Sequence, residues 1–184
     1  MKKTLYILFT FISISSFAQF SKTHYIPPLT AQNNLAEDQF IYISTPSNAD
    51  VSVKIIEIGG NTIIRIITNS KPEIYPIGQG NDSRLFIPKA STGKVSNKGY
   101  IIEADDLIYV SVRVNAGFST VNNSYNHAGG LVSKGNSALG KVFRLGAMLN
   151  PLYDTTLLNF ASILSTENNT AITISNIPDG TVLS

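Results

Sequence analysis

The sequence predicts an all-β fold, an antiparallel β-sandwich or jelly roll. Three observations support this class. Short runs rich in Ile, Val, Thr and Tyr recur along the chain, and Gly, Pro and Asn separate them. Several runs alternate apolar and polar residues with the period of two that a half-buried strand requires. The only stretch without strong β character, residues 133–141, contains Gly135 and Gly140, which disfavour a stable helix.

Composition narrows the class of protein further. The 184 residues are 43% hydrophobic but only 14% charged, whereas charged residues make up about a quarter of an average globular chain. Disordered chains, coiled coils and nucleic-acid-binding domains all carry more charge, so composition argues against each of them. The length allows one domain or slightly more, with room for a hydrophobic core.

The first 18 residues have the pattern of a secretory signal peptide. Residues 1–3 are a basic start, and residues 5–12 are an apolar run. That run is shorter than the roughly 20 residues that span a bilayer, which disfavours a membrane anchor. Small residues near Ala18 place the expected cleavage between Ala18 and Gln19. We therefore expect a secreted or cell-surface protein whose mature chain begins at Gln19.

Cleavage would leave a chain without net charge. It removes Lys2 and Lys3, and the remaining chain has 12 basic and 12 acidic residues. No electrostatic argument for nucleic acid or another anionic partner then remains. The chain has no cysteine, so core packing must stabilise it without disulfides. No second apolar segment approaches membrane-spanning length.

From residue 40 onward the sequence alternates expected strands with turns. The clearest strand is residues 107–115, where Ile108, Val110, Val112 and Val114 alternate with Tyr109, Ser111, Arg113 and Asn115. This alternation predicts one packed face and one solvated face. The expected strands in chain order are residues 40–45, 51–55, 62–68, 73–77, 84–87, 100–103, 107–115, 142–148, 158–166 and 171–176, with a hairpin turn at 59–61.

We expect four parts along the chain. They are a signal peptide (1–18), an N-terminal extended segment (19–39), a β-sandwich domain (40–150) and further strands (151–184). Residues 43–59 and 164–180 are identical at five of 17 aligned positions. Two interpretations remain open: β-hairpins resemble one another, or a unit is duplicated so that residues 151–184 begin a second β unit that continues beyond the chain.

No motif in the sequence predicts catalysis or a bound cofactor. Residues 135–142 are one residue short of a phosphate-binding P-loop, because Val142 stands where that loop needs Ser or Thr. A glycine-rich connection between strands is the better interpretation. Residues 91–94 match the Ser-x-x-Lys spacing of serine acyl-transferases, but the companion motifs are missing. We expect no catalytic, cofactor-binding or metal-binding residue.

The remaining polar candidates have ordinary structural explanations. His24 and His127 lack the i, i+4 partner of a zinc site, so we expect solvated or capping side chains. Residues 37–38 and 105–106 are acidic pairs, for which a role in forming turns is more plausible than calcium binding. Three formal N-glycosylation sequons begin at Asn81, Asn122 and Asn168.

Six segments of the sequence resemble one family of proteins. They are residues 20–30, 41–47, 97–114, 128–135, 139–146 and 162–170. Together they resemble the N-terminal region of large surface proteins from gliding Bacteroidetes-type bacteria. That region is similar to the IgGFc-binding protein N-terminal domain family. The resemblance covers nearly all of residues 20–184, and residues 118–127 are its least similar part.

The resemblance implies an extracellular, non-enzymatic binding or adhesion region at the front of a multidomain protein. Such proteins usually end in a gliding-motility-associated sorting domain for type IX secretion, so the resemblance implies further domains after Ser184. It transfers no catalytic residue and no cofactor. In these bacteria Asp-Thr-Thr resembles an O-glycosylation motif, which would place a sugar on Thr155.

The expected partner is an extracellular glycan or protein, and the sequence does not identify the residues that bind it. Exposed loops at one end of a sandwich are the expected location. One alternative is a structural spacer or cap of a surface filament. Another is an accessory domain of a secreted polysaccharide-acting enzyme, although the acidic residues of the chain form no convincing pair.

Overall fold

A computed structural model describes residues 19–30, 36–80, 83–146 and 160–177. It confirms the predicted class, because the chain forms a curled antiparallel sheet, a half-barrel, and the described residues contain no α-helix. The strands are β1 (Ser21–Ile26), β2 (Ala36–Ser44), β3 (Val51–Glu57), β4 (Thr62–Ile67), β5 (Glu73–Gly78), β6 (Tyr100–Ser119) and β7 (Ser124–Ser133). Two short 3-10 turns, η2 (Lys89–Ser91) and η3 (Gly135–Ala138), complete the set.

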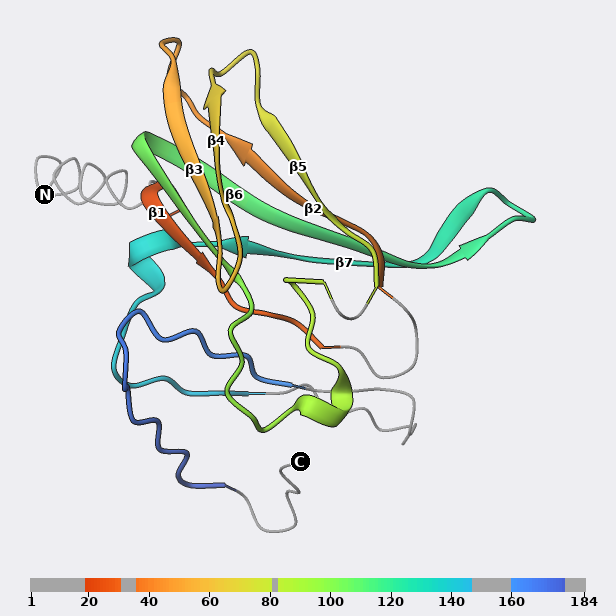
Figure 1. The fold of residues 1–184 in the computed structure, drawn as a ribbon, viewed down its shortest axis with the longest axis vertical. Helices are drawn as coiled ribbons and strands as arrows, with labels where there is room; N and C mark the ends of the chain where they lie inside the picture. Colours follow the sequence, from red (N-terminus) through yellow and green to blue (C-terminus); the bar gives the residue numbers. More distant parts are fainter. Residues whose placement is uncertain (1–18, 31–35, 81–82, 147–159, 178–184) are drawn as a thin grey trace, which may run out of the picture.

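Strand β6 is the centre of the sheet (Figure 1). Its first half pairs with β1 on one side and β3 on the other, and β4 continues beyond β3. Its second half pairs with β7 and β2, and β5 continues beyond β2. The sheet therefore has two four-stranded halves, β1-β6-β3-β4 and β7-β6-β2-β5, which share one long strand.

The two halves meet at a corner in β6, between its pairing with Thr23 and its pairing with Ser21. Thr23 lies opposite Glu103, whereas Ser21 lies opposite Ile108, so β6 contains extra residues here. Bulges of this kind let one strand pass from one sheet direction to another. Asp105 stabilises the corner, because its Oδ1 accepts a 3.0 Å bond from the amide of Ser52.

The predicted phase of residues 107–115 is confirmed. Ile108, Val110 and Val112 are at most 1% exposed, whereas Arg113 is exposed. They form the core with residues of β1 to β4 and of the first half of β6: Ile26, Ile41, Ile43, Val51, Val53, Ile55, Ile67, Tyr100 and Ile102. Area-based estimates of about 25 cal/mol per Å² of apolar surface make this burial the main stabilising contribution.

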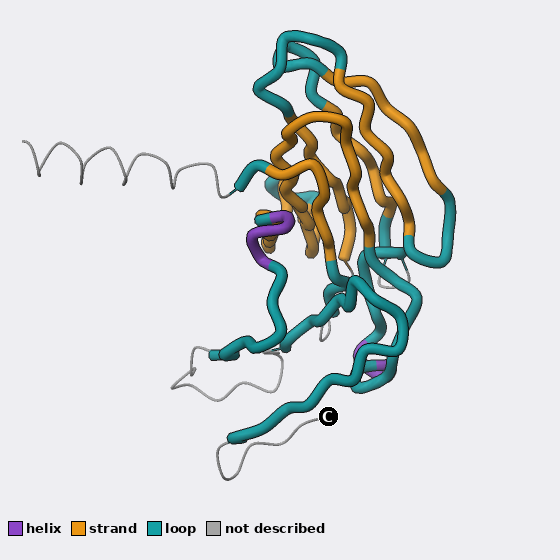
Figure 2. The backbone as a smooth tube through the Cα atoms, turned by 90° about the vertical axis from the view of Figure 1, so that its left-hand side faces the viewer, coloured by secondary structure: helices purple, strands orange, loops and turns teal. Residues whose placement is uncertain are grey.

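A long loop, residues 83–99, closes the lower opening of the half-barrel. Figure 2 shows the strands gathered in the upper part of the molecule and the long loops below them. Buried Gln39 anchors this loop, because its Oε1 accepts a 2.5 Å bond from the hydroxyl of Ser83. Lys98 Nζ donates to the carbonyl oxygens of Ser83 and Phe86. The fully buried Leu85 and the 4% exposed Phe86 reach the core from this loop.

Several predicted strands are absent from the described residues. Residues 84–87 form only an isolated bridge between Phe86 and Leu29, because this segment closes the core from a loop. The described parts of 142–148 and 158–166, and all of 171–176, pair with no strand. Ile172 and Ile174, each 54% exposed, have no sheet to cover them. Conversely, β1 and β7 were not predicted as strands.

Candidate functional site

The outer face of the half-sheet β7-β6-β2-β5 contains a shallow groove of about 270 Å³. It runs along the β6–β7 ladder and is lined by Tyr109, Ser111, Val112, Arg113, Gly130, Leu131 and Val132. We call it the outer groove. Because side chains alternate along β6, Tyr109, Ser111 and Arg113 point outward into the groove. The side chain of Val112 points into the core, so this residue lines the groove mainly with its backbone.

Gly130 makes the floor of the outer groove. It lies opposite Arg113 in the ladder, on the outward-facing side. A Cβ atom at this position would come within 2.4 Å of the carbonyl oxygen of Val112. Any side chain at position 130 would therefore displace the ladder, and the glycine leaves an open surface between Arg113 and Val132.

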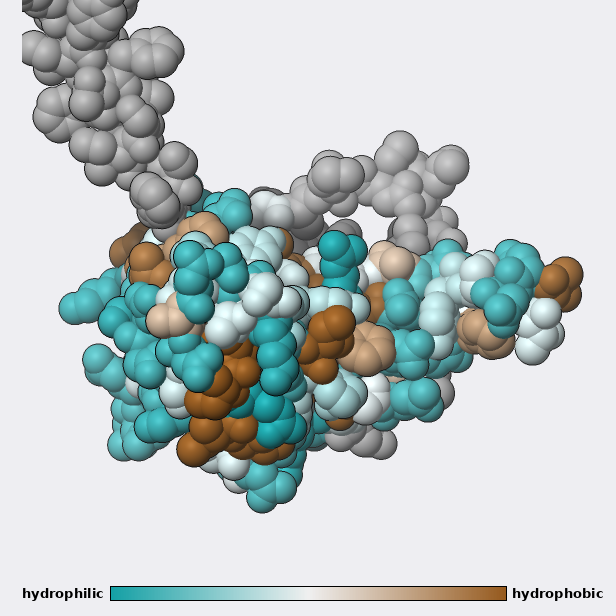
Figure 3. Space-filling view, turned by 90° about the horizontal axis from the view of Figure 1, so that it is seen from above, coloured by the Kyte–Doolittle hydropathy of each residue, from teal (hydrophilic) through white to brown (hydrophobic). Residues whose placement is uncertain are grey.

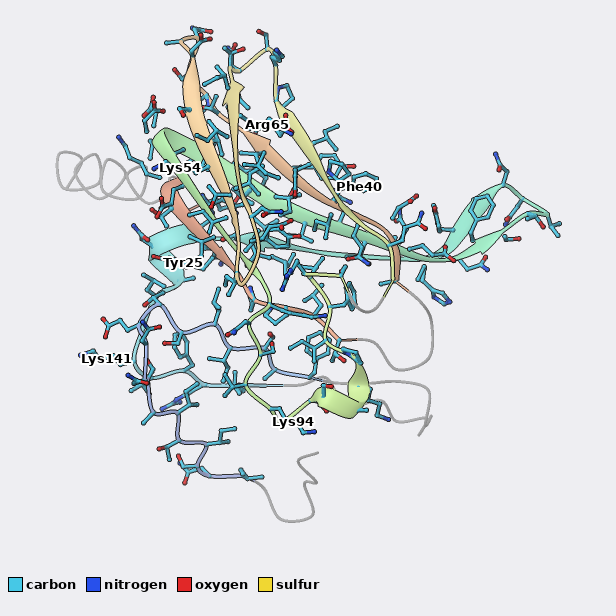
Figure 4. The ribbon with its side chains drawn as sticks, in the orientation of Figure 1. Tyr25, Phe40, Lys54, Arg65, Lys94 and Lys141 are labelled. Carbon is cyan, nitrogen blue, oxygen red and sulfur yellow. The ribbon has the colours of Figure 1, made fainter. Side chains whose placement is uncertain are left out.

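Aromatic rings extend this surface over the neighbouring strands. Phe40 and Tyr42 of β2 lie opposite Arg113 and Ser111, with ring centroids 6.2 Å apart. The ring of Phe20 lies 6.2 Å from that of Tyr109. Phe40 is labelled in Figure 4. The outer face thus combines exposed aromatic surface with a few polar groups, the composition typical of ligand sites.

The outer groove is weakly charged. Among the described residues that line it, only Arg113 carries a charge. A guanidinium presents several N–H donors in a fixed plane and accepts none. The hydroxyls of Ser111 and Tyr109 can donate or accept. This set suits a ligand rich in oxygen acceptors that also has apolar surface.

A second polar cluster, on the inner side, has a structural role. Oε1 of Glu57 on β3 accepts bonds from the hydroxyls of Tyr75 on β5, at 3.0 Å, and Tyr100 on β6, at 3.5 Å. Burial and the nearby Glu57 raise the pKa of Tyr75 to about 12. Burial also raises the pKa of Tyr100. Both phenols stay protonated near neutral pH, and the bond from Tyr75 on β5 to Glu57 on β3 joins the two halves of the sheet.

The expectation for His24 is wrong, because this side chain lies in the core and is not solvated. It is fully buried, and its Nε2 lies 3.0 Å from the carbonyl oxygen of Ile108. Nε2 must donate in this contact, so Nδ1 carries the lone pair, and it has no hydrogen-bond partner. Burial lowers the pKa of His24 below its ordinary value. His127 is exposed on β7.

The other candidates from the sequence do not converge on a site. Ser91 ends the η2 turn and Lys94 follows it on an exposed loop. Lys141 lies on a separate loop, and Figure 4 places both lysines below the sheet and well apart. Residues 142–146, which follow Lys141, form neither the helix that a P-loop needs nor the strand expected there, so the predicted connection between strands is not found in the described residues. Gly135 instead packs on β1, where a Cβ atom would lie 2.2 Å from that of Ser21.

The acidic pairs bind neighbouring backbone and side chains. Asp106 accepts a 2.8 Å bond from the amide of Leu107 at the corner of β6. Glu37 accepts a 3.0 Å bond from the amide of Phe118, and Asp38 accepts a bond from the hydroxyl of Tyr125. Within the described ranges, no three His, Asp or Glu side chains are arranged to hold a metal ion.

Three sequence-based modification or processing sites cannot be placed, because Ala18, Asn81 and Thr155 lie outside the described residues. Of the other positions, Gln19 is exposed, Asn122 lies in the turn between β6 and β7, and Asn168 lies in an exposed turn. In the part of the chain that the structure describes, no helix is long and apolar enough to cross a membrane.

Sequence reasoning did not identify the outer groove. Its walls are alternate residues of the predicted strand 107–115, which were correctly expected to face solvent. The floor of the groove comes from β7, where Gly129 and Gly130 have no side chains to show the alternation of apolar and polar residues that is typical of a strand. The signal for the groove in the sequence was the row Tyr109, Ser111 and Arg113, which places an aromatic ring, a hydroxyl and a guanidinium on the same solvent-facing side of the strand.

Comparisons of the chain with protein-family models, with curated proteins and with solved structures find no match. The resemblance to the IgGFc-binding protein N-terminal domain family therefore stays an expectation from the sequence.

Proposed function

We propose that this chain is a non-catalytic extracellular binding and adhesion region that holds a glycan in the outer groove. The region would belong to a larger secreted or cell-surface bacterial protein, as the signal-peptide pattern and the family resemblance suggest. The observation that carries the proposal is the groove itself. It joins an aromatic side chain, a guanidinium and hydroxyl groups on a rigid sheet.

A sugar chain matches this surface in two ways. The C–H faces of a pyranose ring are apolar and can lie flat on the aromatic rings of Tyr109 or Tyr42. The hydroxyl and ring oxygens at the edge of the sugar can accept hydrogen bonds from Arg113 and Ser111. Because the groove is shallow and follows the strands, it would admit several units of an extended polymer.

Net charge supports a neutral or weakly acidic ligand. The mature chain expected from cleavage has equal numbers of basic and acidic residues, so long-range attraction cannot drive binding. A single arginine in the groove can bind one carboxylate of an acidic sugar in a bidentate manner. Affinity would then come from stacking and short-range hydrogen bonds, and it would change little with salt.

A glycan array probed with the full chain tests this proposal, followed by titration of the strongest glycan. We expect Tyr109→Ala and Arg113→Ser each to weaken binding at least about tenfold, the effect of losing roughly 1.4 kcal/mol. Two exposed residues outside the groove provide matched controls. Phe143→Ala removes an exposed aromatic ring from the loop after η3, and Lys54→Ser removes a cation from the outer face of β3.

Both control variants should bind as the unchanged chain does. The proposal is wrong if no glycan binds. It is also wrong if the groove variants keep full affinity while circular dichroism shows all four proteins folded.

A further inference from the structure

The sheet has four edge strands, and three of them are protected against pairing with another chain. On β4, Arg65 occupies a position in the inward-facing register and pairs with Glu73. Strand β5 contains Pro76, which cannot donate a backbone hydrogen bond. Strand β1 carries exposed Lys22, and η3 packs against it at Ser21. Inward charges, prolines and coverage are the usual ways in which natural sheets protect their edges.

Strand β7 has none of these protections. Its ten residues, Ser124–Ser133, include no charged residue and no proline, and the uncharged stretch extends from residue 114 to residue 133. Within the described part of the chain, β7 forms a ladder with β6 alone. One backbone edge of a long, regular strand is therefore available for pairing.

The hairpin that carries this edge is held in place. Beyond the body of the sheet, β6 and β7 continue as a projecting arm (Figure 1). At the base of the arm, Phe118 donates its amide hydrogen to Glu37, and the hydroxyl of Tyr125 donates to Asp38. The rings of Phe118 and Tyr125 contact each other edge to face, with centroids 5.2 Å apart. A pre-ordered edge loses less conformational entropy when it binds.

We propose that β7 pairs antiparallel with β7 of a second copy of this chain. Each half-sheet would then continue into its partner and form one eight-stranded sheet, β5-β2-β6-β7 followed by the same strands in reverse. A two-fold axis brings the same surface of both copies together. Strand β7 suits such self-pairing because it carries no charge that would repel its copy. Main-chain hydrogen bonds would supply the affinity, as in other cases of strand addition.

Charges elsewhere on the half-sheet do not oppose this arrangement. Within the strands β5, β2, β6 and β7, the one cation is Arg113, which lies one strand further in on β6. At about 4.8 Å between strands, the two copies of β6 would lie roughly 14 Å apart. That separation exceeds the Debye length of about 8 Å at physiological ionic strength. β7 itself carries no charge that would select a charged peptide, and the carboxylates of Glu37 and Asp38 beside the arm already accept hydrogen bonds from Phe118 and Tyr125. The neutral second copy is therefore the better match.

The test uses the full chain, whose mass in solution is measured by sedimentation over a wide range of protein concentration. We expect the mass to double with rising concentration. Ala128→Lys should abolish the doubling. Ala128 is exposed and lies opposite Asn115, so the change adds a charge to the edge without disturbing the core. Thr62→Lys adds the same charge to exposed β4 and should leave the dimer intact.

Two further measurements cover the case in which Ala128→Lys does not fold. Because the chain has no cysteine, Ala128→Cys introduces a single thiol, which should form a disulfide-linked dimer on mild oxidation. Thr62→Cys should stay monomeric under the same conditions. The proposal is overturned if the unchanged chain remains a monomer at every concentration, or if folded Ala128→Lys dimerises normally. Equal cross-linking of the two cysteine variants would also overturn it. This proposal does not depend on glycan binding.

Discussion

Arg65 of β4 and Glu73 of β5 form an ion pair that joins the two ends of the strand order. The distance from Nε to Oε1 is 3.0 Å. The sheet runs β4-β3-β6-β2-β5, so this contact spans the open side of the half-barrel. Its side chains are 44% and 22% exposed, which limits its contribution to stability. Exposed ion pairs typically contribute only about 0–1 kcal/mol.

We expect Arg65→Val to change stability little and solubility considerably. The substitution removes a weak ion pair, so the free energy of unfolding should fall by no more than about 1 kcal/mol. It also makes residues 62–67 an uncharged strand at a free edge, next to Ile64 and Ile66, which are 58% and 50% exposed. Light scattering should therefore show faster aggregation than for Glu73→Gln, which leaves the arginine in place. Equal scattering would show that Arg65 does not protect the edge.

The strand phase of β6 predicts opposite outcomes for two adjacent residues. Val112→Asp places a carboxylate in the core, at a position that is 1% exposed. A buried unpaired charge costs several kcal/mol, comparable with a total stability of about 5–15 kcal/mol. Arg113→Ser, on the solvent side, should unfold within about 0.5 kcal/mol of the unchanged chain. Thermal melts compare the two, and equal melting temperatures would contradict the phase.

The sequence predicted residues 107–115 of β6 and their two faces because four β-branched or aliphatic residues alternate there without interruption. It placed residues 100–103 in a separate strand, whereas the structure joins both segments in one strand. It did not predict β7, since Ala128, Gly129 and Gly130 carry almost no side chain to show a period. Pairing with β6 across the turn at residues 120–123 makes this segment a strand. Residues 84–87 were misassigned for the opposite reason. Leu85 and Phe86 are buried, but they enter the core from a loop.

Acid should destabilise the fold through His24. Burial lowers the pKa of His24 in the folded state, whereas the unfolded chain binds a proton with a pKa near 6.5. Below about pH 6.5 the unfolded state therefore binds more protons, and stability falls as pH falls. Urea midpoints at pH 7.5 and 5.5 should differ for the unchanged chain. In His24→Gln, whose amide can still donate to Ile108, that difference should shrink. A difference of the same size in both proteins would assign the acid sensitivity to other groups.

Gly135 and Gly129 differ in whether the fold tolerates a side chain at their positions. Gly135 has φ of +56°, and a Cβ atom there would lie 2.2 Å from Ser21 Cβ and 2.7 Å from the carbonyl oxygen of Thr23. The left-handed conformation alone costs a non-glycine residue roughly 1–2 kcal/mol, and the contact with β1 adds to this cost. Gly129 faces open space. We expect Gly135→Ala to lower the urea midpoint clearly and Gly129→Ala to leave it nearly unchanged. Similar midpoints would show that η3 does not pack tightly on β1.

Deleting residues 151–184 tests how far the cooperative unit extends. Between residues 160 and 177 the chain forms no strand, and Phe160, Ile163 and Ile172 are each about half exposed. A hydrogen bond from the hydroxyl of Ser162 to the carbonyl oxygen of Pro28 joins this segment to the rest of the chain. The core is built from residues 26–112, so losing the surface contact of Ser162 should cost little. A chain that ends at Asn150 should therefore have the same urea midpoint and slope as the 184-residue chain. It should also aggregate less, because the exposed isoleucines are gone. A large drop in midpoint would show instead that residues 151–184 complete the fold of the half-barrel, and it would rule out a duplicated unit that begins there.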